Sequence, residues 1–140
     1  MEFPMDNIKL AYQMAVDVRK KAYAPYSQFK VGAALKLKNS DEIIVGCNVE
    51  NASLGATICA ERGALMQLFA KHGKSEIEFM VVVTDVKTAS APCGVCRQFL
   101  SEFCGDDFPI YLGNLKGVQK NISLGELLPY RFDKIHDLED

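Results

Sequence analysis

Two stretches, Cys59-Ala60-Glu61 and Pro92-Cys93-Gly94-Val95-Cys96, determine how the rest of this chain is organised. Each lies where a loop or strand pattern changes to a helical pattern, so three thiols and one carboxylate stand at the starts of two predicted helices. Three thiolates can bind one zinc ion and leave the fourth tetrahedral position open to water, which is the arrangement of a catalytic site. Glu61 follows closely after a thiol and is suited to carry a proton for that water.

The size and composition are those of an ordinary globular protein. At 140 residues we expect one domain over 1–140, which buries about two thirds of its unfolded surface. The formal net charge is −2 and no basic run is present, which argues against nucleic acid as a partner. No apolar run approaches the roughly 20 residues that span a bilayer, and the first residues do not resemble a signal peptide. We therefore expect a cytoplasmic protein with no membrane partner.

Apolar periodicity predicts an α/β fold, a three-layer α/β/α sandwich around a mixed sheet of about five strands. Helices are expected over 7–22, 59–72, 93–104 and 123–128, and strands over 30–37, 43–47, 77–83, 108–112 and 118–120. Asp6 or Asn7 is the expected cap of the first helix, and Gly73 and Gly105 are expected to end the second and third. Residues 133–140 are polar and are predicted to form a loose tail.

The strands differ in their expected environment. In 30–37 apolar residues alternate with polar ones such as Lys36, which predicts a half-buried strand. This strand is expected to pair with 43–47 as an antiparallel hairpin. Residues 77–83 are almost continuously apolar, which predicts a central strand covered on both faces. The last two strands are joined too closely for a crossover, so we expect them to be antiparallel.

The thiols have the spacing of metal ligands. Cys93 and Cys96 are three residues apart in one helical turn, so they project from the same face and can bind a single ion. Zn²⁺ with three thiolates still carries a net charge of about −1, which weakens its effect on water unless nearby donors offset that charge. Arg62 and Arg97, each next to a motif, are the candidates for this offset.

Each part of the pattern also has a simpler interpretation. A Cys-x-x-Cys at a helix start is equally compatible with a redox pair, and Cys59 alone with a small buried residue. Five cysteines are an odd number, which fits a reducing compartment and a metal or catalytic cluster rather than disulfides. The ordered combination favours catalytic zinc and is the signature of zinc-dependent nucleobase deaminases. A non-catalytic zinc module remains the alternative, with Cys47 or Cys104 available as a fourth ligand.

The chain resembles the cytidine deaminases of the small, homotetrameric type with three cysteine zinc ligands. The resemblance extends over essentially the whole sequence and rests on five ordered motifs, 29–34, 46–52, 59–62, 92–98 and 126–129. It implies one Zn²⁺ per subunit and hydrolysis of cytidine and deoxycytidine to uridine and deoxyuridine plus ammonia, a step of pyrimidine salvage. Two positions depart from the common pattern: Leu54 stands where an aromatic is frequent, and Gly63 where Thr is common.

The resemblance also implies roles for individual residues. They are zinc ligation by Cys59, Cys93 and Cys96, proton transfer by Glu61, ribose binding by Asn48 and Glu50, a pocket wall at Phe29, and stacking on the pyrimidine in a neighbouring subunit's site by Phe132. In the mechanism that follows, backbone groups near Ala60 and Ala91 are expected to help hold the base. The residues alone would indicate only an ordinary anchor of the tail at Phe132, which remains the alternative. Deoxycytidylate and blasticidin S deaminases are the enzymatic alternatives, but Glu50 at the sugar end would repel a phosphate, which favours a free nucleoside.

Overall fold

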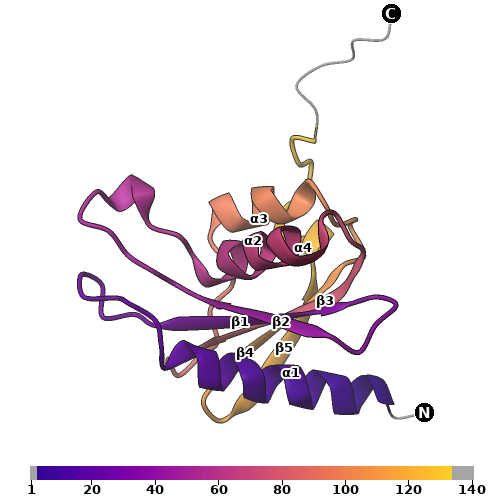
Figure 1. Cartoon of the computed structure of the whole chain (residues 1–140), viewed down its shortest axis with the longest axis horizontal. Helices are drawn as coiled ribbons and strands as arrows, with labels where there is room; N and C mark the ends of the chain where they lie inside the picture. The colour runs from indigo at the N-terminus through magenta and orange to yellow at the C-terminus, as the bar shows by residue number, and fades with distance from the viewer. Residues whose placement is uncertain (1–2, 134–140) are drawn as a thin grey trace, which may run out of the picture.

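A computed structural model of the chain, which describes residues 3–133, has a five-stranded sheet in the order β2-β1-β3-β4-β5. Helix α1 covers one face of the sheet, and α2, α3 and α4 lie on the other (Figure 1). The predicted three-layer fold is confirmed. The elements are α1 (Phe3–Arg19), β1 (Val31–Leu37), β2 (Ile43–Cys47), the 3₁₀ turn η1 (Leu54–Ala56), α2 (Ala60–His72), β3 (Ile77–Thr84), α3 (Gly94–Ser101), β4 (Pro109–Asn114), β5 (Gly117–Ser123) and α4 (Leu124–Leu127). Apart from Asp133, the predicted loose tail lies outside the described residues.

The strand directions explain why two distant helix starts meet. Strand β1 pairs antiparallel with both β2 and β3, so β2 and β3 run in the same direction on either side of it. Each of these two strands leads through a loop into a helix, α2 after β2 and α3 after β3. Both helices therefore begin at the same edge of the sheet. The pairs β1–β2 and β4–β5 are antiparallel as predicted, and β3–β4 is parallel.

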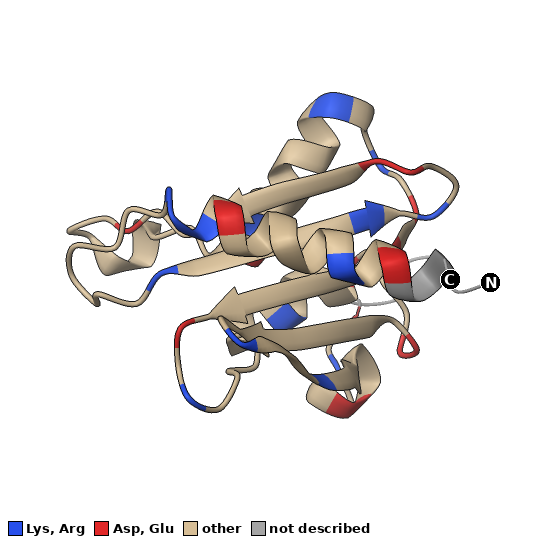
Figure 2. Ribbon diagram, turned by 90° about the horizontal axis from the view of Figure 1, so that it is seen from below, with Lys and Arg blue, Asp and Glu red and all other residues tan. Residues whose placement is uncertain are grey.

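Strand β3 forms the centre of the core, as its apolar run predicted. Met80 and Val82 pack in the cluster under α2, α3 and α4, whereas Val81 and Val83 pack in the cluster under α1. Within the described part of the chain, no helix is both long and apolar enough to cross a membrane. Lysines and arginines are interspersed with aspartates and glutamates over the elements (Figure 2).

The prediction of a half-buried β1 is wrong, because the strand is covered on both faces. Lys36 is only 5% exposed, and its ammonium group donates to Leu37 O at 3.0 Å, Ser40 O at 2.8 Å and Glu78 Oε1 at 2.9 Å. A buried lysine is tolerated when its charge is paired and its donors are used. The polar residue in the alternating pattern thus marks a buried ion pair that joins the hairpin to β3.

The bounds of two helices also differ from the prediction. Helix α1 begins at Phe3 and ends at Arg19, so neither Asp6 nor Asn7 caps it; a proline in the first turn, Pro4, costs no helical hydrogen bond. Helix α3 ends at Ser101 rather than before Gly105. Its last turn tightens into bonds of the i→i+3 type, such as Phe103 N–H to Leu100 O, and the chain leaves the helix there.

Helix α2 lies against β2 at a glycine. A Cβ atom added at Gly46 would lie 2.4 Å from Ala64 N and 2.6 Å from Ala60 O, which no side chain tolerates. The absence of a side chain at this position allows the first turns of α2 to contact the strand backbone directly. Since α2 carries Cys59 at its N-cap and Glu61 in its first turn, this contact positions one half of the candidate site.

Candidate active site

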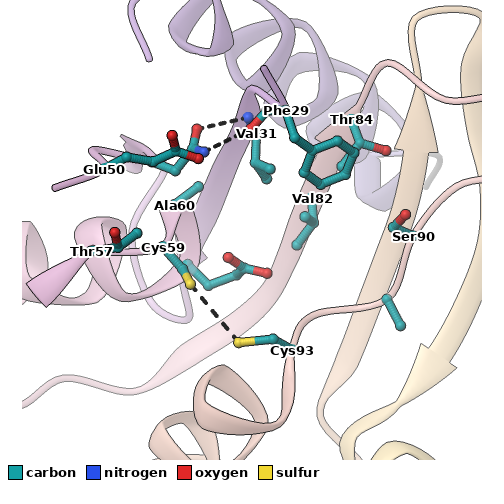
Figure 3. Close-up of a pocket in the computed structure, with 13 residues that line it drawn as sticks. Phe29, Val31, Glu50, Thr57, Cys59, Ala60, Val82, Thr84, Ser90 and Cys93 are labelled. Atoms are coloured by element: carbon teal, nitrogen blue, oxygen red, sulfur yellow. Dashed lines mark hydrogen bonds between the residues drawn. The ribbon is translucent and has the colours of Figure 1, made fainter. Parts of the chain in front are cut away.

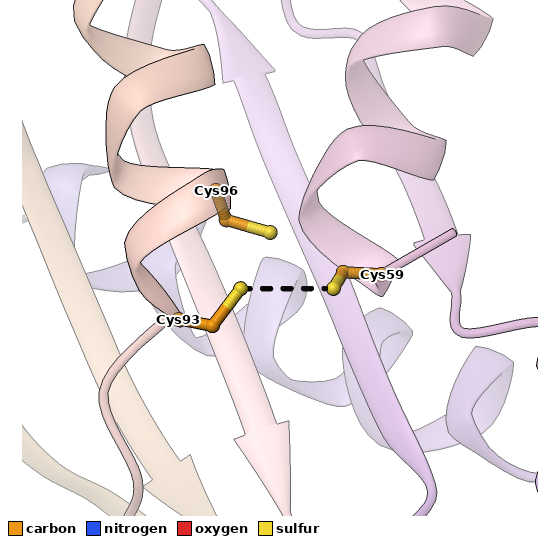
Figure 4. A group of neighbouring side chains, drawn as sticks. All are labelled: Cys59, Cys93 and Cys96. Carbon is orange, nitrogen blue, oxygen red and sulfur yellow. Dashed lines mark hydrogen bonds between the residues drawn. The ribbon is translucent and has the colours of Figure 1, made fainter. Parts of the chain in front are cut away.

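Three sulfur atoms converge at the starts of α2 and α3 (Figure 4). Cys59 is the N-cap of α2, Cys93 is the N-cap of α3, and Cys96 lies in the first turn of α3. Their Sγ atoms all lie within 4.8 Å of one another, and those of Cys59 and Cys93 are 3.9 Å apart. Two thiolates bound at about 2.3 Å to a tetrahedral zinc ion are about 3.8 Å apart, so this spacing fits a single zinc ion.

The protonation of the cluster also fits a cation. The hydrogen bond with Cys96, together with smaller effects of Arg62 and Cys93, lowers the pKa of Cys59 to about 5. The same hydrogen bond, together with burial, raises the pKa of Cys96. The sulfur atoms thus compete for negative charge when no cation is bound. A bound divalent metal ion would remove this competition, because its positive charge stabilises all three groups as thiolates.

Glu61 places a carboxyl group next to the sulfur atoms. Its side chain is only 4% exposed, and its Oε1 accepts a hydrogen bond from Cys96 Sγ at 3.8 Å. Burial raises the pKa of Glu61 to about 7. A carboxyl group with this pKa can both take up and release a proton near neutral pH, which is what an acid–base catalyst requires.

A cavity of about 250 Å³ opens beside Glu61 and contains most of the predicted site residues (Figure 3). Strands β1 and β3, the polar loop after β2, the start of α2 and the loop before α3 all contribute to its wall. The residues that line it are Phe29, Val31, Asn48, Glu50, Thr57, Cys59, Ala60, Glu61, Val82, Thr84, Ser90, Ala91 and Cys93. Segments far apart in the sequence therefore form one pocket with the thiol cluster at one side.

The two polar residues predicted for ribose both lie in this wall. Asn48 is 7% exposed; its Nδ2 donates to Phe29 O and its Oδ1 accepts from Val31 N–H, each at 2.8 Å. The Asn48 carboxamide therefore holds the chain that enters β1, and its second N–H remains for a ligand. Glu50 Oε1 accepts from the backbone N–H groups of Tyr26 at 2.9 Å and Ser27 at 3.1 Å.

The Glu50 carboxylate is held in its charged form. The Ser27 hydroxyl donates to Glu50 Oε2, and this hydrogen bond, with those from the backbone, lowers the pKa of Glu50 below its usual range. One face of the pocket therefore carries a fixed negative charge and strong hydrogen-bond acceptors. Such a face suits the hydroxyl groups of a sugar and disfavours an anion.

The two arginines next to the motifs have different surroundings. Arg62 Nη2 donates to Thr57 O at 3.0 Å and lies 3.8 Å from Cys59 Sγ, where its charge offsets that of a thiolate. In the described part of the chain, both hydrogen bonds of the Arg97 guanidinium go to carbonyl groups, Pro92 O at 2.7 Å and Leu127 O at 2.8 Å. Arg97 therefore joins the loop before Cys93 to α4.

Comparison with known proteins identifies the family. The model of the cytidine and deoxycytidylate deaminase zinc-binding region matches residues 5–112. The chain belongs to this deaminase family. A cytidine deaminase from Halalkalibacterium halodurans is 47% identical over 118 residues, which are 84% of this chain and 88% of the relative. One from Sporosarcina psychrophila is 43% identical over 116 residues, 83% of this chain and 84% of the relative.

A solved structure of the deaminase family has the same fold. The crystal structure of cytidine deaminase from Burkholderia pseudomallei superposes with a TM-score of 0.83 at 42% identity, covering 89% of this chain and 98% of that one. The resemblance inferred from the five sequence motifs is thus confirmed, as is the expectation of a zinc-binding deaminase domain.

Among the residues predicted to bind the substrate, Phe132 lies apart from the pocket. Its side chain is 62% exposed, and its carbonyl oxygen accepts from Gln98 Nε2 on α3 at 2.6 Å. Within one chain, Phe132 is not among the residues that line the cavity. Leu54, where other members of the deaminase family often have an aromatic, is 71% exposed on η1 and is also outside the lining.

Sequence reasoning did not single out several lining residues, among them Thr57, Val82, Thr84 and Ser90. The two-residue period of β3 contained a signal, because Val82 and Thr84 must share a face. Thr84 is 2% exposed, and its hydroxyl has no hydrogen-bond partner among the described residues. Thr57 and Ser90 lie in loops without periodicity, so nothing local indicated their place in the pocket.

Proposed function

We propose that the protein is a zinc-dependent cytidine deaminase that hydrolyses cytidine and deoxycytidine to uridine and deoxyuridine, with release of ammonia. One observation carries this proposal: Cys59, Cys93 and Cys96 converge on a single point, and the buried carboxyl group of Glu61 lies beside them in the same pocket. Membership of the deaminase family supports it. The reaction is a step of pyrimidine salvage, and its place is the cytoplasm.

The residues of the site have distinct tasks in this reaction. Cys59, Cys93 and Cys96 would hold the zinc ion, which when bound supplies a Lewis acid that acidifies water. Glu61 takes the proton of the water that attacks C4, and passes protons to N3 and then to the amino group, which leaves as ammonia. The Glu61 carboxyl group, with Oε1 3.8 Å from Cys96 Sγ, lies beside the three sulfur ligands and so next to the position of that water. Arg62 offsets part of the thiolate charge.

The wall of the pocket favours a free nucleoside over a nucleotide. No lysine or arginine is among the described residues that line it, and Glu50 contributes a negative charge. A phosphate would therefore meet repulsion rather than a counter-charge. Asn48 and Glu50 bind the ribose hydroxyls, Phe29 forms a wall, and the backbone near Ala60 and Ala91 contacts the base. Along the described elements, lysines and arginines alternate with aspartates and glutamates (Figure 2), which does not favour a polynucleotide substrate.

A substrate panel tests this function. The zinc-loaded protein is incubated with cytidine, deoxycytidine, deoxycytidine monophosphate and blasticidin S, and ammonia release and the absorbance change on deamination are followed. We expect turnover of the two nucleosides and little of the other compounds. Preferential turnover of the monophosphate or of blasticidin S would assign the site to one of those activities instead. No turnover, together with a metal spectrum of four thiolate ligands, would indicate a zinc-stabilised binding module.

The active form is a homotetramer in which Phe132 completes a neighbouring subunit's pocket. Two features support this assembly: the large exposure of Phe132 in a single chain, and the apolar surface of α3 around Val95 and Phe99, which Gln98 links to Phe132. In the test, Phe132→Ala and Glu61→Gln chains are dissociated and reassembled together. Mixed oligomers should recover activity that neither variant has alone, because some sites then receive Glu61 from one chain and Phe132 from another. A fully active monomer would contradict the proposal.

A further inference from the structure

The loop 85–92 connects the end of β3 to Cys93 and contributes Ser90 and Ala91 to the pocket. It has no helix or strand of its own. In the part of the chain that the structure describes, the backbone groups of 86–92 make no hydrogen bond to other backbone groups. Buried or half-buried polar backbone groups need partners, so the position of this loop depends on side chains from elsewhere.

Five hydrogen bonds from three side chains supply these partners. Asn114 Nδ2 donates to Val86 O and to Lys87 O, each at 3.0 Å. Gln119 Oε1 accepts from Ala89 N–H at 2.8 Å, and Gln119 Nε2 donates to Lys87 O at 3.5 Å. The fifth bond is that of Arg97 to the carbonyl of Pro92 at the other end of the loop.

Both anchors in the β4–β5 hairpin are themselves held in place. Asn114 is 5% exposed at the end of β4; its Oδ1 accepts from Lys116 N–H at 2.9 Å, and its carbonyl oxygen accepts from Tyr12 OH at 2.7 Å. Gln119 lies at a break in the β4–β5 register: Leu112 pairs with Lys120, the next residue on β4 pairs with Val118, and Gln119 is left without a partner. A bulge of this kind redirects a side chain, here towards the loop.

We propose that Gln119 and Asn114 are positioning residues that set the pocket wall at Ser90 and Ala91. Gln119 holds Ala89 and Arg97 holds Pro92, the residues on either side of Ser90 and Ala91. The wall is thus fixed while the backbone groups of Ser90 and Ala91 remain for a ligand. The proposal rests on the proposed function, since it assigns the wall to substrate binding rather than to proton transfer. The loss of an anchor should therefore weaken substrate binding more than it slows the chemical step.

Gln119 is the better position for a test, because it is exposed and its replacement leaves the core unchanged. Gln119→Leu removes both hydrogen bonds and should raise the KM for cytidine about three- to tenfold, the usual effect of one or two such bonds, with kcat and zinc content near those of wild type. Gln119→Glu keeps the acceptor for Ala89 N–H and should restore a KM close to wild type. Asn121→Leu, on an exposed residue of the same strand, is the matched control and should change nothing.

A second measurement is independent of activity. NMR order parameters of the amides of 87–91 in the zinc-loaded protein should fall in Gln119→Leu and remain high in Gln119→Glu and Asn121→Leu. Unchanged KM and order parameters in Gln119→Leu would overturn the proposal. A Gln119→Leu protein whose main defect is a lower zinc content or a lower kcat would overturn it as well. If wild type does not convert cytidine but the order parameters change as stated, the proposed function fails and the role of Gln119 and Asn114 in holding the pocket wall stands.

Discussion

The carboxyl group of Glu61 accepts a hydrogen bond from the thiol of Cys96 at 3.8 Å, although the two residues belong to different helices and are 35 positions apart. This contact joins the proton carrier to the candidate metal centre. Glu61 is buried with it, which raises the pKa of the carboxyl group to about 7. An acid–base group in the cavity wall is thus in direct contact with a candidate metal ligand behind it.

Glu61→Gln should separate proton transfer from metal binding. The amide keeps the size of the side chain but cannot carry the proton, so we expect kcat for cytidine to fall by at least about 10²-fold. Zinc content should remain one per chain, because the three sulfur ligands are unchanged. Atomic absorption and the absorbance assay measure the two quantities on the same sample. Near-normal turnover in this variant would show that another group moves the proton.

The zinc stoichiometry should depend on three of the five cysteines. Cys59→Ala removes a sulfur atom from the cluster and should abolish tight zinc binding and activity. Cys104→Ala is the matched control: Cys104 is buried, and burial raises its pKa to about 12, so it is a neutral thiol outside the cluster. We expect this control to bind one zinc ion per chain and to stay active. Loss of zinc in Cys104→Ala would indicate a closed four-sulfur site.

Two glycines around α2 should respond to alanine with opposite signs. At Gly63, a Cβ atom would lie 3.5 Å from Cys47 O, an ordinary contact, so Gly63→Ala should raise the free energy of unfolding by about 0.4–1 kcal/mol. At Gly46 the added Cβ would lie 2.4 Å from Ala64 N, so Gly46→Ala should lower the free energy of unfolding by about 1–3 kcal/mol or more. Urea unfolding of the two variants measures both effects. Equal changes in the two would contradict the close approach of α2 to β2.

Glu42 should make part of the stability dependent on pH. Hydrogen bonds from Lys71 and His72 lower the pKa of Glu42 in the folded protein. The stabilisation is therefore fully present above the unfolded pKa of about 4.3 and is lost as the pH falls through the lower folded value. Glu42→Gln should therefore reduce stability more at pH 6 than at pH 3. Urea midpoints of both proteins at the two pH values test this; a larger difference at pH 3 would contradict the sign.

Much of the fold followed from local patterns. The apolar run of 77–83 predicted the central strand, and Gly73, with a φ of +72°, ends α2 where a glycine was expected to end it. The burial of β1 was not predictable in this way. Lys36 looks like a surface residue in the sequence, and only its contact with Glu78, 42 positions away, shows that its charge is paired.

The candidate site, too, has features that local sequence patterns predict and features that depend on tertiary contacts. The sequence by itself determined the chemistry: which residues offer thiols, which offers a carboxyl group, and that they stand at helix starts, because capping and periodicity act over a few neighbouring residues. Only the tertiary structure decided how these groups meet and what holds the rest of the pocket. The parallel course of β2 and β3 brings the two helix starts to one edge of the sheet. Gln119 accepts a hydrogen bond from Ala89 N–H, 30 positions away, and this contact ties down the loop that carries Ser90 and Ala91. Such contacts form between segments that the fold brings together, and no local rule of the chain specifies them.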